Sequence, residues 1–296
     1  MPEKSCVELL AGNSPELAER TGPDAAKRPV IAIVNGSPHS GGYTSQLVER
    51  VTAGVEDAGG TADVLRLVEF RIAPCVNTPG WPCWPDGRCH HVEDDTSLAR
   101  ERVQRADGLV VACPVYWSDI NGLTKTFLDK MRLSGFEGKP ALGITMAGGS
   151  GNGMVLALRS LHGFFGWGYR PLPPLPVCRF NFTQALETAY QRGHEMATAA
   201  RCPRPFANWA EQLRWERSLP FADWCILDEK LYLAGLLIEN APAPPDSHDS
   251  KEAQKLLAHA RQLIDNHGID QAIEDIALAV EKGRTLWKMN VPLSAQ

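Results

Sequence analysis

Three short segments of the chain carry residues that could bind one anionic, aromatic ligand. The segment 36–44, GSPHSGGYT, combines hydroxyl groups with glycines directly before a helical pattern. Backbone N–H groups of such a turn, at the start of a helix, can bind a phosphate without a lysine. The segment 114–117, PVYW, places two flat aromatic side chains after a buried run, and 147–153, AGGSGNG, offers open backbone. These segments predict a ligand with a phosphate at one end and a planar ring at the other.

Simpler explanations exist for the same residues. A turn rich in Ser, Gly and Thr often does no more than cap a helix, and Tyr116 and Trp117 could be ordinary core residues. The chain lacks the GxxxxGK[ST] pattern, and no GxGxxG follows its first strand, which disfavours ATP or GTP hydrolysis and the usual dinucleotide site. The agreement between the loops favours a bound ligand over these alternatives.

Strand and helix patterns alternate between residues 29 and 200, and they position the three segments. Helical spacing occurs, for example, at 94–107 and 183–200. Several prolines between 171 and 176 make the last strand an edge or irregular one. The alternation predicts an α/β fold with a doubly wound, five-stranded parallel sheet, whose carboxyl edge brings the three segments together. The predicted strands are 30–34, 62–68, 109–113, 140–146 and 172–178.

The patterns divide the chain into three regions. Residues 1–28 are polar and are expected to form an N-terminal arm, 29–202 form the sheet domain, and 203–296 form a helical C-terminal extension without strand-like runs. The aromatic residues of the extension could pack on the sheet domain, on a second subunit, or over the site as a lid. They are Trp209, Trp215, Phe221, Trp224, Tyr232 and Trp287.

The composition disfavours several classes of protein. With 296 residues, 44% hydrophobic content, a net charge of −5 and a pI near 5.9, the chain can bury a core but has no basic footprint for nucleic acid. No apolar run reaches the roughly 18 residues of a membrane span, and the first residues lack a signal-peptide pattern. Eight cysteines in a chain too long to need disulfides indicate reduced thiols. We therefore expect a cytoplasmic protein, and neither nucleic acid nor membrane as a partner.

In combination, the three loops resemble those of the flavodoxin-like NAD(P)H-dependent FMN reductase family, which includes quinone reductases and iron-sulfur flavoproteins. GSPHSGGYT resembles the family's phosphate loop, PVYWSDINGLTKTFLDKM its flavin-ring loop with the helix that follows, and AGGSGNG its second ring-contacting loop. The resemblance covers about residues 29–200 and implies a flavodoxin-like fold, to which this chain adds an unusual C-terminal helical extension. It also implies FMN as the cofactor and NAD(P)H as the electron donor.

The resemblance implies which residues hold the cofactor. His39 stands where the family usually has arginine, and Tyr43 where it usually has asparagine. The first loop would hold the phosphate, and the other two would frame the isoalloxazine ring. No catalytic side chain is implied, since the flavin itself carries the chemistry. The implied cofactor-binding residues are Ser37, His39, Tyr43, Thr44, Ser45, Pro114, Val115, Tyr116, Trp117, Ala147, Gly148, Gly149 and Gly151.

The activity implied is that of an FMN-dependent NAD(P)H oxidoreductase. Hydride would pass from the nicotinamide to the flavin, and from there to a quinone, a flavin or another small aromatic acceptor. One alternative is a flavin dehydrogenase or reductase dedicated to a biosynthetic intermediate, for which the extension would build a private pocket. Another is a non-enzymatic electron carrier that holds FMN, with or without an iron-sulfur cluster. Because family members commonly pair, a homodimer or homotetramer is also implied.

A cysteine-rich segment bears on the iron-sulfur branch of the family. Cys75, Cys83 and Cys89 resemble the compact motif that supplies four cysteines to the cluster of iron-sulfur flavoproteins. Here the CxxC step is missing, and a fourth ligand would have to be an adjacent histidine or a distant cysteine. We therefore expect neither an iron-sulfur cluster nor zinc. The loop is expected to bind substrate instead, with Trp81 and Trp84 as a wall of the pocket above the flavin.

Overall fold

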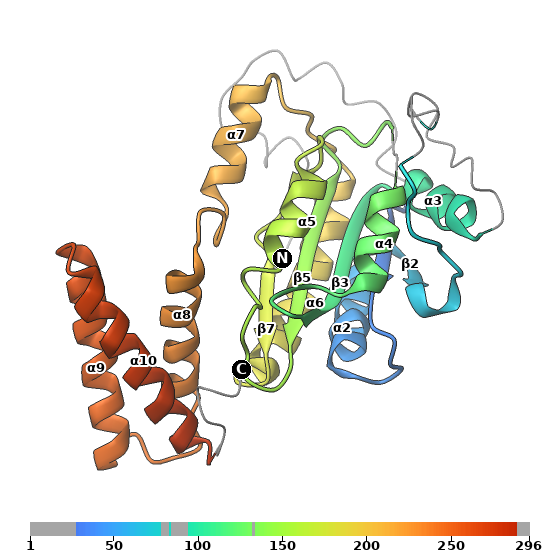
Figure 1. The fold of residues 1–296 in the computed structure, drawn as a ribbon. Coiled ribbons are helices and arrows are strands. Elements are labelled where there is room, and N and C mark those ends of the chain that lie inside the picture. Colours follow the sequence, from blue (N-terminus) through green and yellow to red (C-terminus); the bar gives the residue numbers. More distant parts are fainter. Residues whose placement is uncertain (1–27, 78–82, 84–93, 132–133, 289–296) are drawn as a thin grey trace.

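The computed structural model describes residues 28–77, 83, 94–131 and 134–288, and a parallel β-sheet lies at its centre (Figure 1). The strands of the sheet are β1 (Val30–Asn35), β2 (Thr61–Arg66), β3 (Gly108–Tyr116), β5 (Pro140–Ala147), β6 (Arg170–Pro171) and β7 (Leu175–Cys178). Their spatial order is β2-β1-β3-β5, and the outer position beyond β5 is shared by β6 and β7. Every pair among these strands is parallel.

Helices cover both faces of this sheet. One face carries α2 (Tyr43–Asp57) and α6 (Phe182–Ala200). The other face carries α3 (Thr96–Arg105), α4 (Gly122–Lys130) and α5 (Leu158–Phe165). The inner strands β1 and β5 are buried along almost their whole length, as expected for parallel strands covered on both faces. This order and layering confirm the prediction of a flavodoxin-like, doubly wound five-stranded sheet.

The fifth strand position is broken because it is rich in proline. Prolines stand at 171, 173, 174 and 176, and proline cannot donate a backbone N–H to a strand ladder. β6 pairs with the start of β5, and β7 pairs with its end. Both lie at the edge of the sheet, as the prolines predict.

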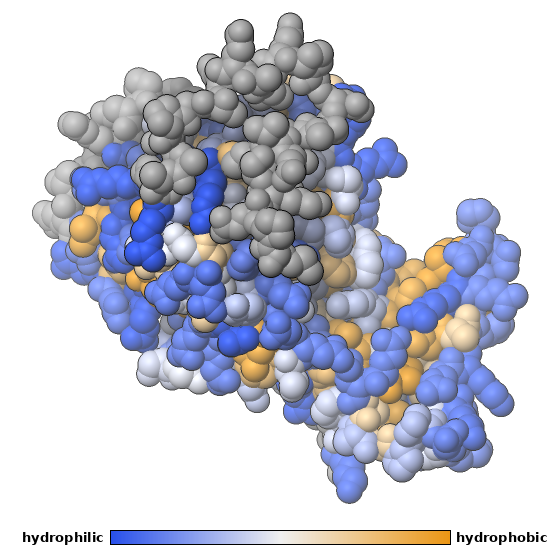
Figure 2. Space-filling model, turned by 180° about the vertical axis from the view of Figure 1, so that it is seen from behind, coloured by the Kyte–Doolittle hydropathy of each residue, from blue (hydrophilic) through white to orange (hydrophobic). Residues whose placement is uncertain are grey.

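Beyond the sheet, the described chain continues as four helices. They are α7 (Trp209–Ser218), α8 (Ile226–Glu239), α9 (His248–Asp265) and α10 (Ile269–Leu286). The hairpin of α9 and α10 packs on α8 (Figure 1). Leu233 and Leu237 of α8 belong to one apolar cluster with that hairpin and with the loops beyond β5 and β7. Seen from behind, apolar side chains gather where the extension faces the sheet domain (Figure 2). No helix in the described ranges is long and apolar enough to cross a membrane.

Most aromatic residues of the extension are packed within the monomer. Trp215 donates its indole N–H to a β6 carbonyl at 3.0 Å, and Trp287 packs edge-on against a ring that follows β7, with 5.0 Å between centroids. Three more rings form a cluster with centroids 4.6 to 5.5 Å apart: Phe221, Trp224 and Tyr232. Trp209, in contrast, is largely exposed. The sheet domain thus contacts both Trp215 and Trp287.

The described cysteines are of two kinds. Cys202 is disulfide-bonded, so the prediction of reduced thiols throughout is wrong at this residue. A cytoplasmic location stays a prediction. The other described cysteines are free thiols: Cys75, Cys83, Cys113, Cys178 and Cys225.

Candidate functional site

The loop after β1 is closed by a hydrogen-bond network centred on Asn35, the last residue of the strand. The Asn35 side chain accepts a hydrogen bond from the N–H of Ser37 at 3.0 Å and donates one to the Ser45 hydroxyl at 3.1 Å. That hydroxyl donates in turn to the carbonyl of His39 at 2.9 Å. The network fixes the shape of the loop, and it engages the Ser45 hydroxyl within the protein. Asn35 is not among the residues predicted from the sequence.

Helix α2 begins inside this loop and leaves donors available at its first turn. Its first helical bond runs from the N–H of Gln46 to the carbonyl of Gly42 at 3.0 Å. The N–H groups of Tyr43, Thr44 and Ser45 precede that bond. The Thr44 side chain is buried, and its hydroxyl makes no hydrogen bond within the described residues. Amide and hydroxyl donors at a helix N-terminus suit a phosphate.

Gly36 joins the loop after β1 to the start of α4. Its carbonyl accepts a hydrogen bond from Nδ2 of Asn121 at 2.8 Å, and the Thr124 hydroxyl donates to Oδ1 of that amide at 2.6 Å. A Cβ on Gly36 would lie 2.0 Å from Oγ1 of Thr124, so a larger residue would displace the helix side chain. The loops after β1 and β3 are therefore locked together at their base. Asn121 and Thr124 are not among the residues predicted from the sequence either.

The loop after β3 is a tight β-hairpin. Its return strand, β4 (Asp119–Ile120), pairs antiparallel with the end of β3. Trp117 and Ser118 form the two-residue turn with φ of +54° and +62°, the pattern of a type I′ turn. Trp117 is 100% exposed and Tyr116 is 47% exposed. The alternative that these rings are core residues is therefore wrong.

The loop after β5 depends on three glycines with positive φ. They are Gly149 (+45°), Gly151 (+79°) and Gly153 (+84°). Gly153 lies against the hairpin turn, because a Cβ there would be 2.4 Å from the Cα of Ser118. Gly151 lies beneath helix α8, because a Cβ there would be 2.9 Å from Cδ1 of Leu233. The third loop therefore contacts both the second loop and the C-terminal extension.

A carboxylate from the extension also reaches the third loop. Glu229 of α8 is fully buried. It accepts hydrogen bonds from the N–H groups of Gly153, Val155 and Leu156 at 2.7, 2.8 and 2.9 Å. Nothing in the sequence indicates Glu229 as a site residue, because a glutamate with helical spacing gives no signal for a partner 76 residues away.

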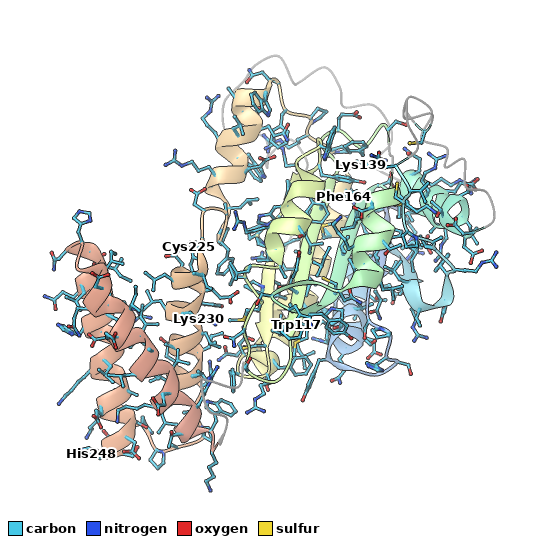
Figure 3. The ribbon with its side chains drawn as sticks, in the orientation of Figure 1. Trp117, Lys139, Phe164, Cys225, Lys230 and His248 are labelled. Carbon is cyan, nitrogen blue, oxygen red and sulfur yellow. The ribbon has the colours of Figure 1, made fainter. Side chains whose placement is uncertain are left out.

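The three loops meet around one cleft of about 570 Å³. Figure 3 shows Trp117 at the carboxyl edge of the sheet and Lys230 on α8. Of the predicted residues, Ser45 faces a neighbouring cleft and Gly151 is buried beneath α8. All the others line the cleft: Ser37, His39, Tyr43, Thr44, Pro114, Val115, Tyr116, Trp117, Ala147, Gly148 and Gly149. The lining also includes residues outside the predicted set: Gly42, Ser118, Met146, Ser150 and Asn152.

The base of the cysteine-rich segment is fixed by a buried ion pair. Asp94 accepts hydrogen bonds from the N–H groups of Ala73 and Thr96, both at 3.0 Å, and from the ammonium of Lys130. Burial by itself would raise the pKa of Asp94, but these hydrogen bonds outweigh burial and hold the pKa well below its usual value. The ion pair thus ties the segment to the end of α4.

The cysteine-rich segment itself is described only in part. Cys75 is exposed and Cys83 is partly exposed, and both are free thiols. Cys89, Trp81 and Trp84 lie outside the described residues. The metal-free loop and its tryptophan wall therefore stay predictions.

Comparisons with known proteins bear on the same region. Residues 29–179 match the family described as NADPH-dependent FMN reductase. An iron-sulfur flavoprotein of Methanocaldococcus jannaschii is 24% identical over 136 residues, which are 45% of this chain and 69% of that protein. YwqN of Bacillus subtilis, described provisionally as an NAD(P)H-dependent FMN-containing oxidoreductase, is 30% identical over 100 residues, which are 34% of this chain and 50% of that protein.

Among solved structures, an NAD(P)H:quinone oxidoreductase from Methanothermobacter marburgensis aligns with a TM-score of 0.44 and 18% identity. The alignment covers 57% of this chain and 98% of that one. The family match alone spans about half of this chain, and it coincides with the sheet whose carboxyl edge forms the cleft. The chain therefore belongs to the NADPH-dependent FMN reductase family of oxidoreductases.

Proposed function

We propose that the cleft binds FMN, and that the protein oxidises NAD(P)H and passes the electrons through the flavin to a quinone, a free flavin or another small aromatic acceptor. One observation carries this proposal: three loops meet in one cleft, with available phosphate donors at one end and exposed aromatic side chains at the other. The volume of about 570 Å³ lies within the range of small-molecule and cofactor sites.

The residues at the first loop fit the phosphate of FMN. The N–H groups of Tyr43 and Thr44 precede the first helical bond, and the Thr44 hydroxyl has no partner in the described part of the chain. Hydrogen bonds from such donors to a charged phosphate are stronger than neutral ones. Ser37 also lines the cleft, but its hydroxyl exchanges hydrogen bonds with the backbone of His39 at 3.2 and 3.3 Å. We therefore assign direct phosphate binding first to Thr44.

The residues at the other two loops fit a planar ring. A Cβ at Gly148 or Gly149 would meet nothing within 4 Å, so a ring can approach the backbone closely there. Backbone N–H groups so placed are suited to stabilise negative charge on a bound ring. Tyr116 and Trp117 supply aromatic surface from the hairpin. Once bound, FMN supplies the ring that accepts and donates hydride.

The side chains of the cleft are suited to binding rather than to proton transfer. No carboxylate, lysine or arginine is among the described residues that line it. Its titratable side chains, within the described residues, are His39, Tyr43 and Tyr116. We therefore propose that the protein binds, orients and shields the reactants, and we assign no side chain to proton transfer.

The extension favours a second, narrower candidate function. Leu233 and Glu229 of α8 contact the third loop directly, so the extension supports one wall of the cleft from behind, although none of its described residues lines the cleft. A flavin reductase dedicated to one biosynthetic intermediate would use such support to shape the cleft for its acceptor. We also propose a homodimer or homotetramer, because the fully exposed Trp117 offers aromatic surface to a second copy; light scattering tests this assembly.

An anaerobic absorbance spectrum of the purified protein, followed by addition of NADPH, tests the main proposal. We expect flavin bands at ~370 and ~450 nm, directly or after FMN is added, and rapid bleaching by NADPH. Addition of menadione should restore the bands and complete a turnover. A protein that takes up no FMN would contradict the proposal. Slow bleaching by NADPH with a stable one-electron-reduced spectrum would favour the electron carrier instead.

A further inference from the structure

We infer that Glu229 is a positioning residue of the cleft: the C-terminal extension uses it to hold the third loop and, through that loop, the aromatic hairpin. This inference rests on the proposed FMN site. A fully buried carboxylate is costly unless it is hydrogen-bonded. Glu229 satisfies this need with three backbone N–H groups, all between Gly153 and Leu156. A buried charge is thus used to fix a segment that directly follows Asn152, a residue of the cleft wall.

These N–H groups have few other partners. They lie just before α5, which has no side-chain cap at its own N-terminus. The turn ahead of α5 closes with bonds from Ala157 to Gly153 and from Leu158 to Val155, both at 3.0 Å. Those bonds use the carbonyls of Gly153 and Val155 and leave their N–H groups for Glu229. Glu229 therefore supplies, from a distant helix, the acceptor for the turn that precedes α5.

Gly153 transmits this restraint to the hairpin. Its φ of +84° brings its backbone against the turn, where a Cβ would lie 2.4 Å from the Cα of Ser118 and 2.9 Å from Cγ1 of Val115. The turn residues Trp117 and Ser118 themselves hold positive φ without being glycines, a conformation that needs support from its surroundings. A loop that moves at Gly153 would release this support.

Two other residues of α8, close to Glu229, contact the same loop. Lys230 donates a hydrogen bond to the side-chain oxygen of Asn152, which lines the cleft. Leu233 covers Gly151. Residues 151, 152 and 153 are therefore each contacted by a different residue of α8. Three such specific contacts distinguish α8 from a helix that only packs against the loop.

The test replaces Glu229 by glutamine, which keeps the size of the side chain but turns one acceptor into a donor. The matched control is Glu239→Gln on the same helix, where the side chain is 62% exposed and lies 3.8 Å from Arg261. Both variants, as full-length chains, are compared with the unaltered protein by hydrogen–deuterium exchange, by FMN titration and by the visible circular dichroism of bound FMN. Glu229→Asp, which keeps the charge but shortens the reach, replaces the glutamine variant if the latter does not fold.

For E229Q we expect at least tenfold faster amide exchange at 153–156 and in the hairpin at 115–120. We also expect a tenfold or larger rise in the Kd for FMN and an altered visible dichroism, whereas E239Q should match the unaltered protein in all three. Faster exchange at 153–156 with an unchanged Kd and dichroism would overturn the inference, because the role of Glu229 would then be structural only.

The exchange experiment also separates this inference from the proposed function. If the unaltered protein binds no FMN, the proposed function fails, and exchange in the hairpin decides the remaining claim. Faster hairpin exchange in E229Q would still support the link from α8 to the aromatic turn. Unchanged hairpin exchange would overturn it.

Discussion

At the scale of single residues, the Thr44 hydroxyl has no hydrogen-bond partner among the described residues. Its removal therefore tests ligand binding without breaking a hydrogen bond of the fold. We predict that Thr44→Val raises the Kd for FMN about 10- to 100-fold, since a hydrogen bond to a charged group contributes about 1.5–3 kcal/mol. Isothermal titration calorimetry measures the change. Riboflavin, which lacks the phosphate, is the control ligand, and its affinity should not change. An equal loss for both ligands would show that Thr44 does not contact the phosphate.

The sequence indicates the hydroxyl groups around the proposed phosphate site, but it does not show which of them are available to a ligand and which are bound within the loop. Thr44 and Ser45 are adjacent and chemically similar, yet only Ser45 is engaged by the Asn35 network. Side-chain networks of this kind depend on how the strand end and the helix start meet in space. Glu229 is the extreme case, because its partners lie more than seventy residues earlier in the chain.

At the scale of elements, substitution of a glycine by alanine should change stability in opposite directions in the third loop and in the helix that follows it. We predict that Gly153→Ala destabilises the protein by at least about 2 kcal/mol, because positive φ and a close backbone contact both oppose a Cβ. Gly163→Ala in α5 is the control. A Cβ there meets nothing within 4 Å, so it should stabilise the helix by about 0.5–1 kcal/mol. Urea denaturation measures both, and destabilisation of equal size would contradict the contact at Gly153.

Elements with long apolar runs were predictable, whereas the hairpin was not. The strands of the sheet and the helices of the extension follow the hydrophobic periodicity of the sequence, and even the proline-broken strand falls at the expected edge. β4 has two residues, too few for any periodicity, and its turn, Trp117-Ser118, lacks the Asn-Gly signature of a type I′ turn. The sequence therefore indicated a ligand loop at this place but not the shape that exposes Trp117.

At the scale of the whole molecule, the buried pair of Asp94 and Lys130 predicts how stability depends on pH. The side chains are 6% and 2% exposed. Hydrogen bonds lower the pKa of folded Asp94 below its unfolded value of ~3.9. Ionised Asp94 therefore stabilises the fold above pH ~4, and this contribution is lost as the pH falls further.

We accordingly predict that Asp94→Asn lowers the free energy of unfolding by about 3–5 kcal/mol at pH 7, the usual cost of leaving one buried charge unpaired. The difference from the unaltered protein should shrink below pH ~4. Urea denaturation from pH 3 to 7 measures both quantities. Asp94→Asn combined with Lys130→Met is the control, and it should recover much of the loss. A pH-independent difference would mean that Asp94 acts through packing and not through its charge.

The fold and the family could be predicted because they reside in the first two thirds of the chain, where motifs and periodicity agree. The role of the extension could not, because nothing in a helical pattern says which surface it covers. Its contact with the third loop depends on Leu233 and Glu229, which look like an ordinary core residue and an ordinary surface residue in the sequence.

The late position of Glu229 in the chain also affects the order in which the protein folds during synthesis. A chain synthesised from its N-terminus completes β1 to α6 before helix α8 exists. During that interval the amides of Gly153, Val155 and Leu156 lack their acceptor, and the third loop has no support from the extension. We therefore expect the third loop to reach its final conformation only when α8 docks, after the sheet is complete.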